Sequence, residues 1–215
     1  MRSTKPIAII DYGSGNLQSI INALNYLKIP NKLVNKPEHL YLYEKAILPG
    51  VGSFKNAMKN LKKTYFSESI IDLIRKKKLY LLGICLGMQL FYDFSEEDGG
   101  CKGLGIVPGI VKKIQNHKNV RVPNIGWRKI SKFTKSNLLQ GIKIDSTFYF
   151  VHSYACNTAD ESVVTGKLKY GKTFDVLIEA QNVLGAQFHP EKSQDAGLKI
   201  LKNFSNISLN KTNLD

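Results

Sequence analysis

The residue best suited to covalent chemistry is Cys85, the central residue of a G-x-C-x-G motif at 83–87. The motif follows an apolar run and precedes a helical pattern. It is the cysteine form of the nucleophile elbow, a strained strand-to-helix turn that exposes the nucleophile. We expect glycine at both ends because the strand and the helix leave no room for a Cβ atom. The helix N-terminus would favour a thiolate, and the N–H of Leu86 would bind a developing oxyanion. A small buried cysteine at a tight turn is the alternative interpretation, and we adopt it for Cys101 and Cys156.

A cysteine nucleophile needs a base, and His189, in the sequence His-Pro-Glu, is the best placed of the four histidines. Proline disfavours helix at the preceding residue, so His189 should be extended. Side chains two apart in an extended segment project to the same side, so Glu191 would lie beside His189 and orient its ring. His-x-Glu alone would also fit a surface strand end, but a buried run at 183–188 precedes it, and strand ends carry the sites of α/β folds. His152 is the rival base, but it has no carboxylate at such a spacing, and we expect it to be structural or to form a pocket wall.

Two glycines at 50 and 52 follow the apolar residues 46–48. They allow the backbone of this Pro-Gly-Val-Gly segment to approach a ligand closely, and its amides would supply a second oxyanion donor. Glycines often end strands, so this segment supports a catalytic site only in combination with the G-x-C-x-G motif and the His-Pro-Glu sequence.

Strands and helices must position these residues, and the apolar pattern predicts both. Short apolar runs bounded by turn residues indicate buried strands, and apolar residues at helical spacing indicate helices between them. The predicted strands are 7–11, 31–34, 46–48 and 79–84, and the predicted helices cover 17–27, 54–61 and 70–74 and begin again near residue 86. This alternation predicts an α/β fold with a mostly parallel sheet that helices flank on both faces.

The second half of the chain predicts an antiparallel extension of this sheet. Strand-like segments with short turns follow one another at 105–114, 147–155, 163–170, 173–180 and 183–188. The sequence Tyr-Gly-Lys at 170–172 is a hairpin candidate, and the last helix covers 196–204. We expect one domain over 1–207 and a frayed polar tail over 208–215.

Composition limits the class of protein. The chain has 215 residues, of which 43% are apolar, and this suits one globular domain rather than a disordered chain. The longest apolar runs are too short to cross a bilayer, and the N-terminus lacks the apolar region of a signal peptide. Three widely spaced cysteines do not indicate a disulfide framework. We therefore expect a cytoplasmic protein with no membrane partner, no metal and no cofactor.

The formal net charge of +14 is concentrated in one stretch, which we call the acid-free stretch. It covers residues 99–144, contains no Asp or Glu, and carries ten Lys and Arg residues. Such a stretch could be a solvated face, a docking site for an acidic protein, or a surface for nucleic acid. No nucleic-acid-binding motif accompanies it, so we expect no nucleic-acid partner.

Three segments together establish a family resemblance: PGVGSF at 49–54, GICLGMQLF at 83–91 and QFHPEKS at 187–193. With them the chain resembles the class I (triad) glutamine amidotransferases, which implies the fold of that family. DYGSGN at 11–16, FYFVHSY at 148–154 and the absence of an attached synthetase domain make the resemblance closest to one group. This group is the glutaminase subunits of imidazole glycerol phosphate synthase, in histidine biosynthesis.

The resemblance implies roles for individual residues. Cys85 would attack the side-chain amide of glutamine, His189 would relay protons, and Glu191 would hold His189, so that glutamate and ammonia are formed. Backbone amides of Val51 and Leu86 would form the oxyanion hole. The positions that cradle glutamine would be Gly50, Gly52, Gln89, Ser153 and Tyr154.

The resemblance also implies a partner. In the family, ammonia passes through a tunnel into a (β/α)8-barrel synthase subunit, so we expect a heterodimer. Bulk water protonates free ammonia, and this independently favours a docked acceptor. The residues implied at the interface and the ammonia entrance are Asn16, Pro123, Asn124, Gly126, Trp127, Arg128, Tyr149 and Lys192.

One motif departs from the family pattern. The usual P-H-M-G-W-N is Pro-Asn-Ile-Gly-Trp-Arg at 123–128, so Asn124 and Arg128 replace a histidine and an asparagine, while Trp127 is retained. Because the departure lies inside the acid-free stretch, we hypothesise that this stretch is in part a docking face for an acidic rim on the synthase. The departure keeps a second function open, a paralogous glutaminase that feeds a sugar-amidating enzyme in surface-polysaccharide or flagellin-sugar synthesis. A stand-alone cysteine hydrolase is the more remote alternative.

Overall fold

The computed structural model describes residues 5–116 and 120–208, with only the backbone of residues 132 and 133. The predicted tail beyond residue 208, together with His117 and Lys118, lies outside the described residues. The helices are α1 (Leu17–Tyr26), α2 (Phe54–Lys63), α3 (Phe66–Arg75), α4 (Leu86–Gln89) and α5 (Gln194–Asn206), with 3₁₀ turns η1 (Pro37–Leu42), η2 (Glu97–Gly99), η3 (Glu161–Val163) and η4 (Pro190–Lys192). Within the described residues, no helix has the length and apolar character needed to span a membrane.

Fourteen strands complete the described structure. Those of the first half are β1 (Ile7–Ile10), β2 (Asn31–Val34), β3 (Lys45–Leu48), β4 (Tyr80–Ile84), β5 (Tyr92–Ser95), β6 (Cys101–Lys102) and β7 (Val107–Lys113). Those of the second half are β8 (Asn124–Lys129), β9 (Lys132–Phe133), β10 (Thr147–His152), β11 (Tyr154–Thr158), β12 (Val164–Tyr170), β13 (Lys172–Ala180) and β14 (Val183–Ala186).

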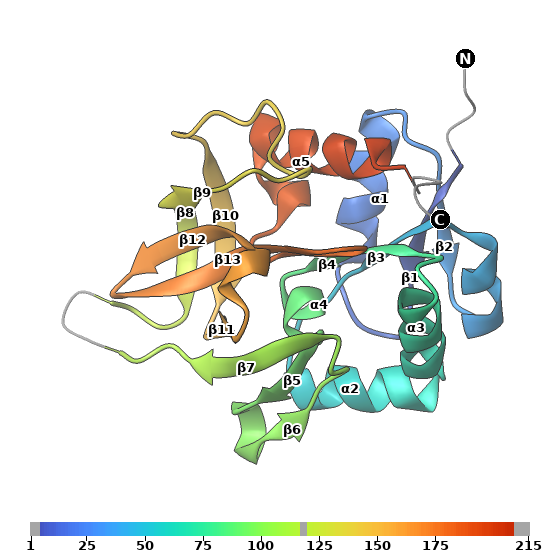
Figure 1. The fold of residues 1–215 in the computed structure, drawn as a ribbon, viewed down its shortest axis with the longest axis horizontal. Helices are drawn as coiled ribbons and strands as arrows, with labels where there is room; N and C mark the ends of the chain where they lie inside the picture. Colours follow the sequence, from blue (N-terminus) through green and yellow to red (C-terminus); the bar gives the residue numbers. More distant parts are fainter. Residues whose placement is uncertain (1–4, 117–119, 209–215) are drawn as a thin grey trace.

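Five parallel strands form the centre of the molecule, in the order β2–β1–β3–β4–β14. Helices α1 and α5 cover one face of this sheet, and α2 and α3 cover the other (Figure 1). Alternate residues of β1 serve the two faces, because Ile7 and Ile9 pack in the core with α1 and α5, whereas Ala8 and Ile10 pack with α2 and α3. Burial on both faces explains the continuous apolar runs and confirms the predicted α/β fold.

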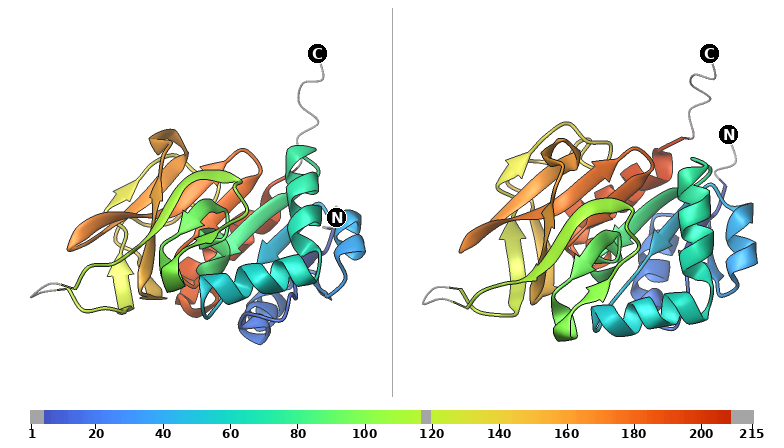
Figure 2. Two further views of the ribbon diagram at one scale, coloured as in Figure 1. Left: turned by 90° about the horizontal axis from the view of Figure 1, so that it is seen from below. Right: turned by 60° about the horizontal axis from the view of Figure 1, so that its bottom comes forward.

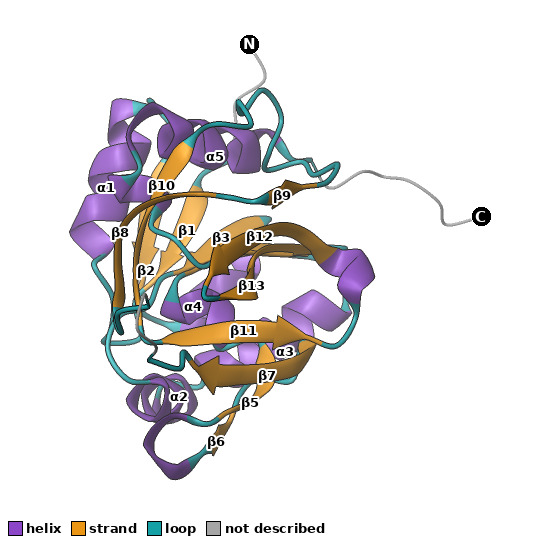
Figure 3. Cartoon of the chain, turned by 90° about the vertical axis from the view of Figure 1, so that its left-hand side faces the viewer, coloured by secondary structure: helices purple, strands orange, loops and turns teal. Residues whose placement is uncertain are grey.

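Beyond β14 the sheet continues through the antiparallel strands β13 and β11, and then through β7, β5 and β6. The predicted hairpin joins β12 to β13, with Tyr170 opposite Lys172 and Gly171 at φ 70° in the turn. A separate ribbon of β8 and β10 lies beside this part of the sheet (Figure 2, Figure 3). The predicted antiparallel extension is therefore confirmed.

Three local expectations differ from the structure. The segment 147–155 is two strands in different sheets, because β10 pairs with β8 along its whole length, while β11 joins β7 and β13. The chain crosses between the two sheets at Ser153. The helix expected from residue 86 is the single turn α4. Strands β5, β6, β8 and β9 are additional to the predicted ones, and none of them contains a continuous apolar run from which a strand could be predicted.

The three segments that carry the family resemblance meet at one edge of the sheet. The Pro-Gly-Val-Gly segment follows β3, Cys85 follows β4, and His189 comes soon after β14. These strands are parallel neighbours in the order β3–β4–β14, so their carboxyl ends lie side by side. The topology of the sheet thus brings together residues that are far apart in the sequence.

Replacing Gly87 with Ala should test how tightly this edge is packed. A Cβ at position 87 would lie 1.9 Å from the carbonyl oxygen of Leu48, so the ends of β3 and β4 would have to separate. We expect a loss of about 3 kcal/mol in the free energy of unfolding, measured by urea denaturation. Gly166→Ala is the matched control, because its nearest contacts, Cβ and Cδ1 of Leu177 at 3.0 Å, are far less close than the 1.9 Å approach at Gly87. Equal losses in the two variants would contradict this interpretation.

Candidate active site

Cys85 occupies the strained turn that its motif predicts. It lies between β4 and α4 with φ 54° and ψ −110°, a backbone conformation that residues other than glycine rarely adopt. A Cβ at Gly83 would lie 2.6 Å from the ring of Phe91, and Gly87 is held against Leu48 as described above. Packing therefore requires both glycines, as expected, and Cys85 is held at the sheet edge with 7% of its surface exposed.

The start of α4 offers N–H groups beside Cys85. The first N–H groups of a helix have no partner within the helix, and the N–H of Leu86 belongs to the residue next to the nucleophile. Because α4 has only four residues, its macrodipole is small. The N–H groups themselves, rather than a long helix dipole, are what this turn offers to a negative charge.

His189 and Glu191 form the second part of the site. Nδ1 of His189 and Oε1 of Glu191 are 2.8 Å apart, and both side chains are almost fully buried. They are neighbours because Pro190–Lys192 form a 3₁₀ turn, and not through the strand alternation that we expected. The N–H of His189 donates to the carbonyl of Tyr149 at 2.9 Å, and the hydroxyl of Ser193 donates to the carbonyl of His189 at 2.6 Å. These bonds fix the His189 backbone against β10.

The surroundings of His189 keep it protonated. Burial alone would lower the pKa of His189, but hydrogen bonding and charge interactions with Cys85 and Glu191 raise it to about 10. Glu191 occupies Nδ1, so Nε2 is the nitrogen left for Cys85. Within the described residues this buried Nε2 makes no hydrogen bond. The arrangement is an imidazolium held beside a cysteine nucleophile, with the carboxylate behind it.

His152 lies in the same pocket in the opposite protonation state. Its Nδ1 is 2.8 Å from the carbonyl oxygen of Tyr154, which only accepts, so Nδ1 carries the proton. Nε2 therefore accepts from the side-chain amide of Asn124 at 3.0 Å. Burial lowers the pKa of His152 to about 4, and the positive charge of His189 adds to this effect. A neutral histidine with both nitrogens engaged suits the pocket-wall role expected for it.

The Pro-Gly-Val-Gly segment packs directly against the turn that holds Cys85. A Cβ at Gly50 would lie 2.8 Å from both the N atom of Gly87 and the Cβ of Leu86, so only glycine fits there. The carbonyl oxygens of Pro49 and Val51 accept hydrogen bonds at 2.9 Å from the hydroxyls of Tyr12 and Ser14, respectively. The DYGSGN segment at 11–16 thus supports the loop from behind and sets the orientation of its peptide groups.

These groups surround one pocket of about 370 Å³. Most of the predicted site residues line it, namely Val51, Gly52, Cys85, Leu86, Gln89, Ser153, Tyr154 and His189. Pro123, expected at the interface, and His152 line it too. Gly50 instead borders a narrow crevice behind His189 together with Asn16 and Glu191. The side chain of Asn16 accepts from the N–H of Ser19 and caps α1.

The sequence did not point to Glu97, which also lines the pocket. This carboxylate accepts a hydrogen bond from the N–H of Phe54 at 2.7 Å, at the start of α2, and burial raises its pKa. No signal marks it in the sequence, because it belongs to an acidic run at 96–98 of the kind common on surfaces. Val151, the second unexpected lining residue, has its carbonyl oxygen 3.9 Å from Sγ of Cys85.

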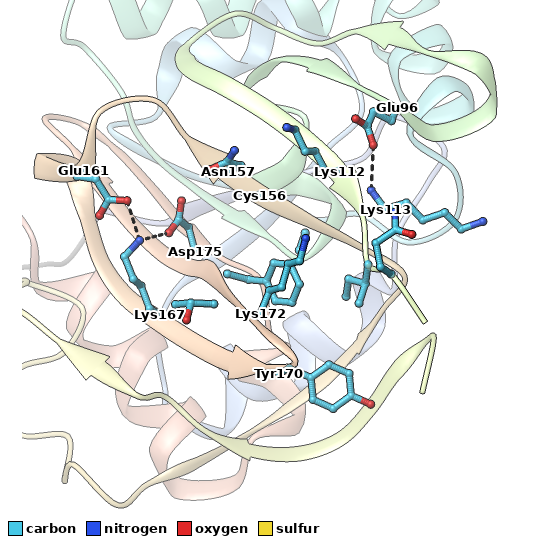
Figure 4. A pocket seen from close by; sticks show the side chains of 15 residues that line it. Glu96, Lys112, Lys113, Cys156, Asn157, Glu161, Lys167, Tyr170, Lys172 and Asp175 are labelled. Atoms are coloured by element: carbon cyan, nitrogen blue, oxygen red, sulfur yellow. Dashed lines mark hydrogen bonds and ion pairs between the residues drawn. The ribbon is translucent and has the colours of Figure 1, made fainter. Parts of the chain in front are cut away.

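A second cavity of about 430 Å³ lies between β7, β11, β12 and β13 (Figure 4). It holds Cys156, but burial raises the pKa of that thiol well above its usual value, and no histidine is among the residues that line it. Lys167 is paired there with Glu161 at 2.8 Å and with Asp175 at 2.7 Å. Despite its size, this cavity lacks a cysteine paired with a histidine, so we assign the cysteine chemistry to the smaller pocket.

The retained Trp127 lies on an exposed face of the β8–β10 ribbon. It is paired with Tyr149 across the two strands, and their rings meet edge to face at 5.9 Å. Trp127 and Ile125 are 40% and 53% exposed, respectively, and both project from the same side of β8. Lys192, also expected near the interface, is exposed in η4.

Asn124 and Arg128 do not share this face, contrary to our expectation. Residues two apart in a strand project to the same side, so 124, 126 and 128 face away from Trp127. Asn124 is fully buried against His152, and Arg128 lies over the ring of Tyr170 at 5.2 Å. The departure from the family motif therefore concerns inward contacts, and Gly126 lies between the two with φ 124°.

The acid-free stretch is likewise not one continuous face. Lys112 and Lys113 line the second cavity (Figure 4), whereas Lys129 projects to the same side of β8 as Trp127. Only part of the basic charge therefore accompanies the exposed aromatic residues.

The two pocket histidines should titrate at opposite extremes. In histidine-selective ¹⁵N NMR, His189 should keep its proton up to about pH 10, and His152 should stay neutral down to about pH 4. The unfolded chain releases the His189 proton near pH 6.5. The His189 contribution to stability is therefore complete below that pH and is lost as the pH rises through about 10. Glu191→Gln should lower the His189 midpoint by at least about one unit. Titration of both histidines near pH 6.5 would contradict this assignment.

The chain has close relatives among known proteins. The family model for glutamine amidotransferase class-I matches residues 8–207. The imidazole glycerol phosphate synthase subunit HisH 1 of Campylobacter jejuni subsp. jejuni serotype O:23/36 (strain 81-176) is 43% identical over 94% of this chain and 100% of the relative. The HisH subunit of Methanocaldococcus jannaschii is 45% identical over 92% of this chain and 97% of its own length.

Solved structures share the fold at lower identity. A crystal structure of a glutamine amidotransferase superposes with a TM-score of 0.72 at 20% identity, covering 93% of this chain and 99% of that chain. PurLQS from Thermotoga maritima gives a TM-score of 0.70 at 19% identity, covering 94% and 98%, respectively. Site geometry, family model and relatives agree, and the chain belongs to the class-I glutamine amidotransferase family, close to the HisH subunits within it.

Proposed function

We propose that this chain is the glutaminase subunit of an imidazole glycerol phosphate synthase, which supplies ammonia from glutamine for histidine biosynthesis. The observation that carries the proposal is the placement of Cys85, His189 and Glu191 at adjacent strand ends around one pocket. The HisH names of relatives 43–45% identical over nearly the whole chain support the pathway.

The proposed reaction proceeds through a thioester. Sγ of Cys85 attacks the carbonyl carbon of the glutamine side-chain amide, and Nε2 of His189 gives its proton to the departing ammonia. Water, deprotonated by the same nitrogen, then attacks the thioester and releases glutamate. Glu191 holds Nδ1 throughout and stabilises the imidazolium. We assign the oxyanion to the N–H groups of Leu86 and Val51.

The same pocket offers groups for the amino-acid end of glutamine. Both N–H groups of the Gln89 amide are used, since Nε2 lies 2.9 Å from the carbonyl of Tyr154 and 2.9 Å from Oε1 of Gln187. Its oxygen is the part left for a ligand, and an oxygen suits the α-ammonium group. We place the ammonium between this oxygen and the carboxylate of Glu97, with Gly52, Ser153 and Tyr154 completing the cradle.

A partner subunit follows from the same reasoning, and we propose that it is a (β/α)8-barrel synthase. The exposed pair Trp127 and Tyr149 and the half-exposed Val51 at the pocket mouth are the surfaces we assign to it, with Lys192 and Asn16 near the ammonia entrance. Because Asn124 and Arg128 face inward on β8, their departure from the family motif gives no separate support to the sugar-amidating alternative. We further propose that residues 1–207 act as one glutaminase domain, and that the free thiols Cys85, Cys101 and Cys156 suit the cytoplasm.

Cys85→Ala should separate the two half-reactions. In the complex with the synthase subunit, glutamine-dependent synthesis should fall by roughly 10⁴-fold or more, because the nucleophile is gone. Synthesis from added ammonium salts should remain, because the acceptor site is untouched.

Replacing each histidine should identify the base. His189→Ala should lower the rate of glutamine hydrolysis about 10²-fold or more, and His152→Ala should lower it much less. Residual glutamine hydrolysis by Cys85→Ala would rule out Cys85 as the nucleophile. Full glutamine hydrolysis by the wild-type chain without a partner would instead indicate a stand-alone hydrolase.

Glu97→Gln should weaken glutamine binding with little effect on the chemical step. The amide keeps an oxygen for the N–H of Phe54 but loses the charge that we assign to the α-ammonium group. We expect KM for glutamine to rise about tenfold in steady-state assays of the complex. Glu96→Gln is the matched control, since Glu96 is exposed and lies outside this pocket. A fall in kcat at constant KM would contradict the assignment.

A further inference from the structure

Gln187 is a fully buried amide beside the nucleophile that the mechanism above leaves without a role. It follows β14 and lies two residues before His189. Its backbone N–H donates to the carbonyl of Val176 on β13 at 2.9 Å. This bond fixes the segment in the sheet, so the side chain is held at a defined distance from Cys85.

The side chain of Gln187 bridges Cys85 and Gln89. Nε2 of Gln187 lies 3.7 Å from Sγ of Cys85, within hydrogen-bonding reach of sulfur, and Oε1 lies 2.9 Å from Nε2 of Gln89. The neighbours determine which way the amides point. Gln89 must donate to the carbonyl of Tyr154, so its second N–H meets the oxygen of Gln187. The N–H of Gln187 is thereby directed to the sulfur.

We propose that Gln187 is a positioning residue that donates a hydrogen bond to the Cys85 thiolate and couples that thiolate to Gln89. Its donor role stands on the contacts above, while the link to substrate rests on the proposed function. A hydrogen bond stabilises the charged form of its acceptor, and this buried sulfur has little water to do so. Amides in series polarise one another, so a cation on the oxygen of Gln89 strengthens the N–H that Gln187 presents to the sulfur.

The charged and titratable groups around Cys85 stay the same when only Gln187 is changed. They are His189 and Glu191 after β14, His152 on β10, Tyr12 after β1, Cys156 on β11 and Glu97 in η2. A change in thiol reactivity in such a variant is therefore assigned to the amide of Gln187, provided that the fold is retained.

The test is the pH dependence of alkylation of Cys85 by iodoacetamide in the full chain, measured on the Cys85 peptide by mass spectrometry. Gln187→Met keeps the length of the side chain but removes the donor, and Gln187→Leu removes the donor with a shorter apolar side chain. Neither variant adds a charge beside Cys85. Both variants should raise the alkylation midpoint by about one pH unit, which makes alkylation about tenfold slower below the midpoint. Asn203→Leu is the matched control, because it removes a buried amide of α5 that donates to the carbonyls of Leu138 and Gln140, away from this pocket.

An unchanged midpoint in a folded Gln187 variant overturns the donor role, and Gln187→Leu serves if Gln187→Met does not fold. The coupling is tested by combining Gln187→Met with Gln89→Met. If the two amides are linked, the midpoint shift of the double variant is smaller than the sum of the two single shifts. Additive shifts overturn the coupling. In the complex, Gln187→Met should lower kcat for glutamine with little change in KM. If the wild-type complex does not use glutamine at all, the proposed function fails, while the alkylation result still decides the role of Gln187.

Discussion

The close approach of the turn after β4 to the end of β3 is the constraint on which the active site depends. The backbone at Gly87 touches the carbonyl of Leu48, and Gly50 touches Leu86 and Gly87 from the other side. No side chain fits between these segments. The contact brings the peptide groups of both loops to the same nucleophile and forces Cys85 into a backbone conformation with positive φ. Packing of the sheet edge therefore stabilises the strain at this residue.

Two histidines share the pocket, and their hydrogen bonds distinguish them. His189 has a carboxylate on one nitrogen and the nucleophile for the other, so its charged form is stabilised despite burial. His152 has a carbonyl on one nitrogen and the amide of Asn124 on the other, and neither favours a charge strongly enough to offset burial. The base is thus selected by its neighbours, because both rings are buried to a similar extent.

The two residues at 123–128 that depart from the family motif make contacts inside this chain. Asn124 donates to Nε2 of His152, whose tautomer the carbonyl of Tyr154 sets, and Arg128 packs on the hairpin residue Tyr170. Both are contacts within this chain, whereas the exposed Trp127 on the other side of the same strand matches the family. Variation on the inner side of β8 therefore leaves the outer side free to serve a partner.

The sequence alone determined the parallel strands, the helices and the turn around Cys85, because apolar periodicity and glycine spacing reflect local geometry. It also identified the nucleophile, its base and most of the pocket through three short segments. Glu97 and the role of Gln187 came only from the tertiary structure, since neither a carboxylate in an acidic run nor a glutamine just after a strand shows in the sequence what it faces. The inward positions of Asn124 and Arg128 and the break at Ser153 depend on strand pairing between distant segments. Local patterns record which side of a strand is buried, but only the assembled sheets decide what lies on that side.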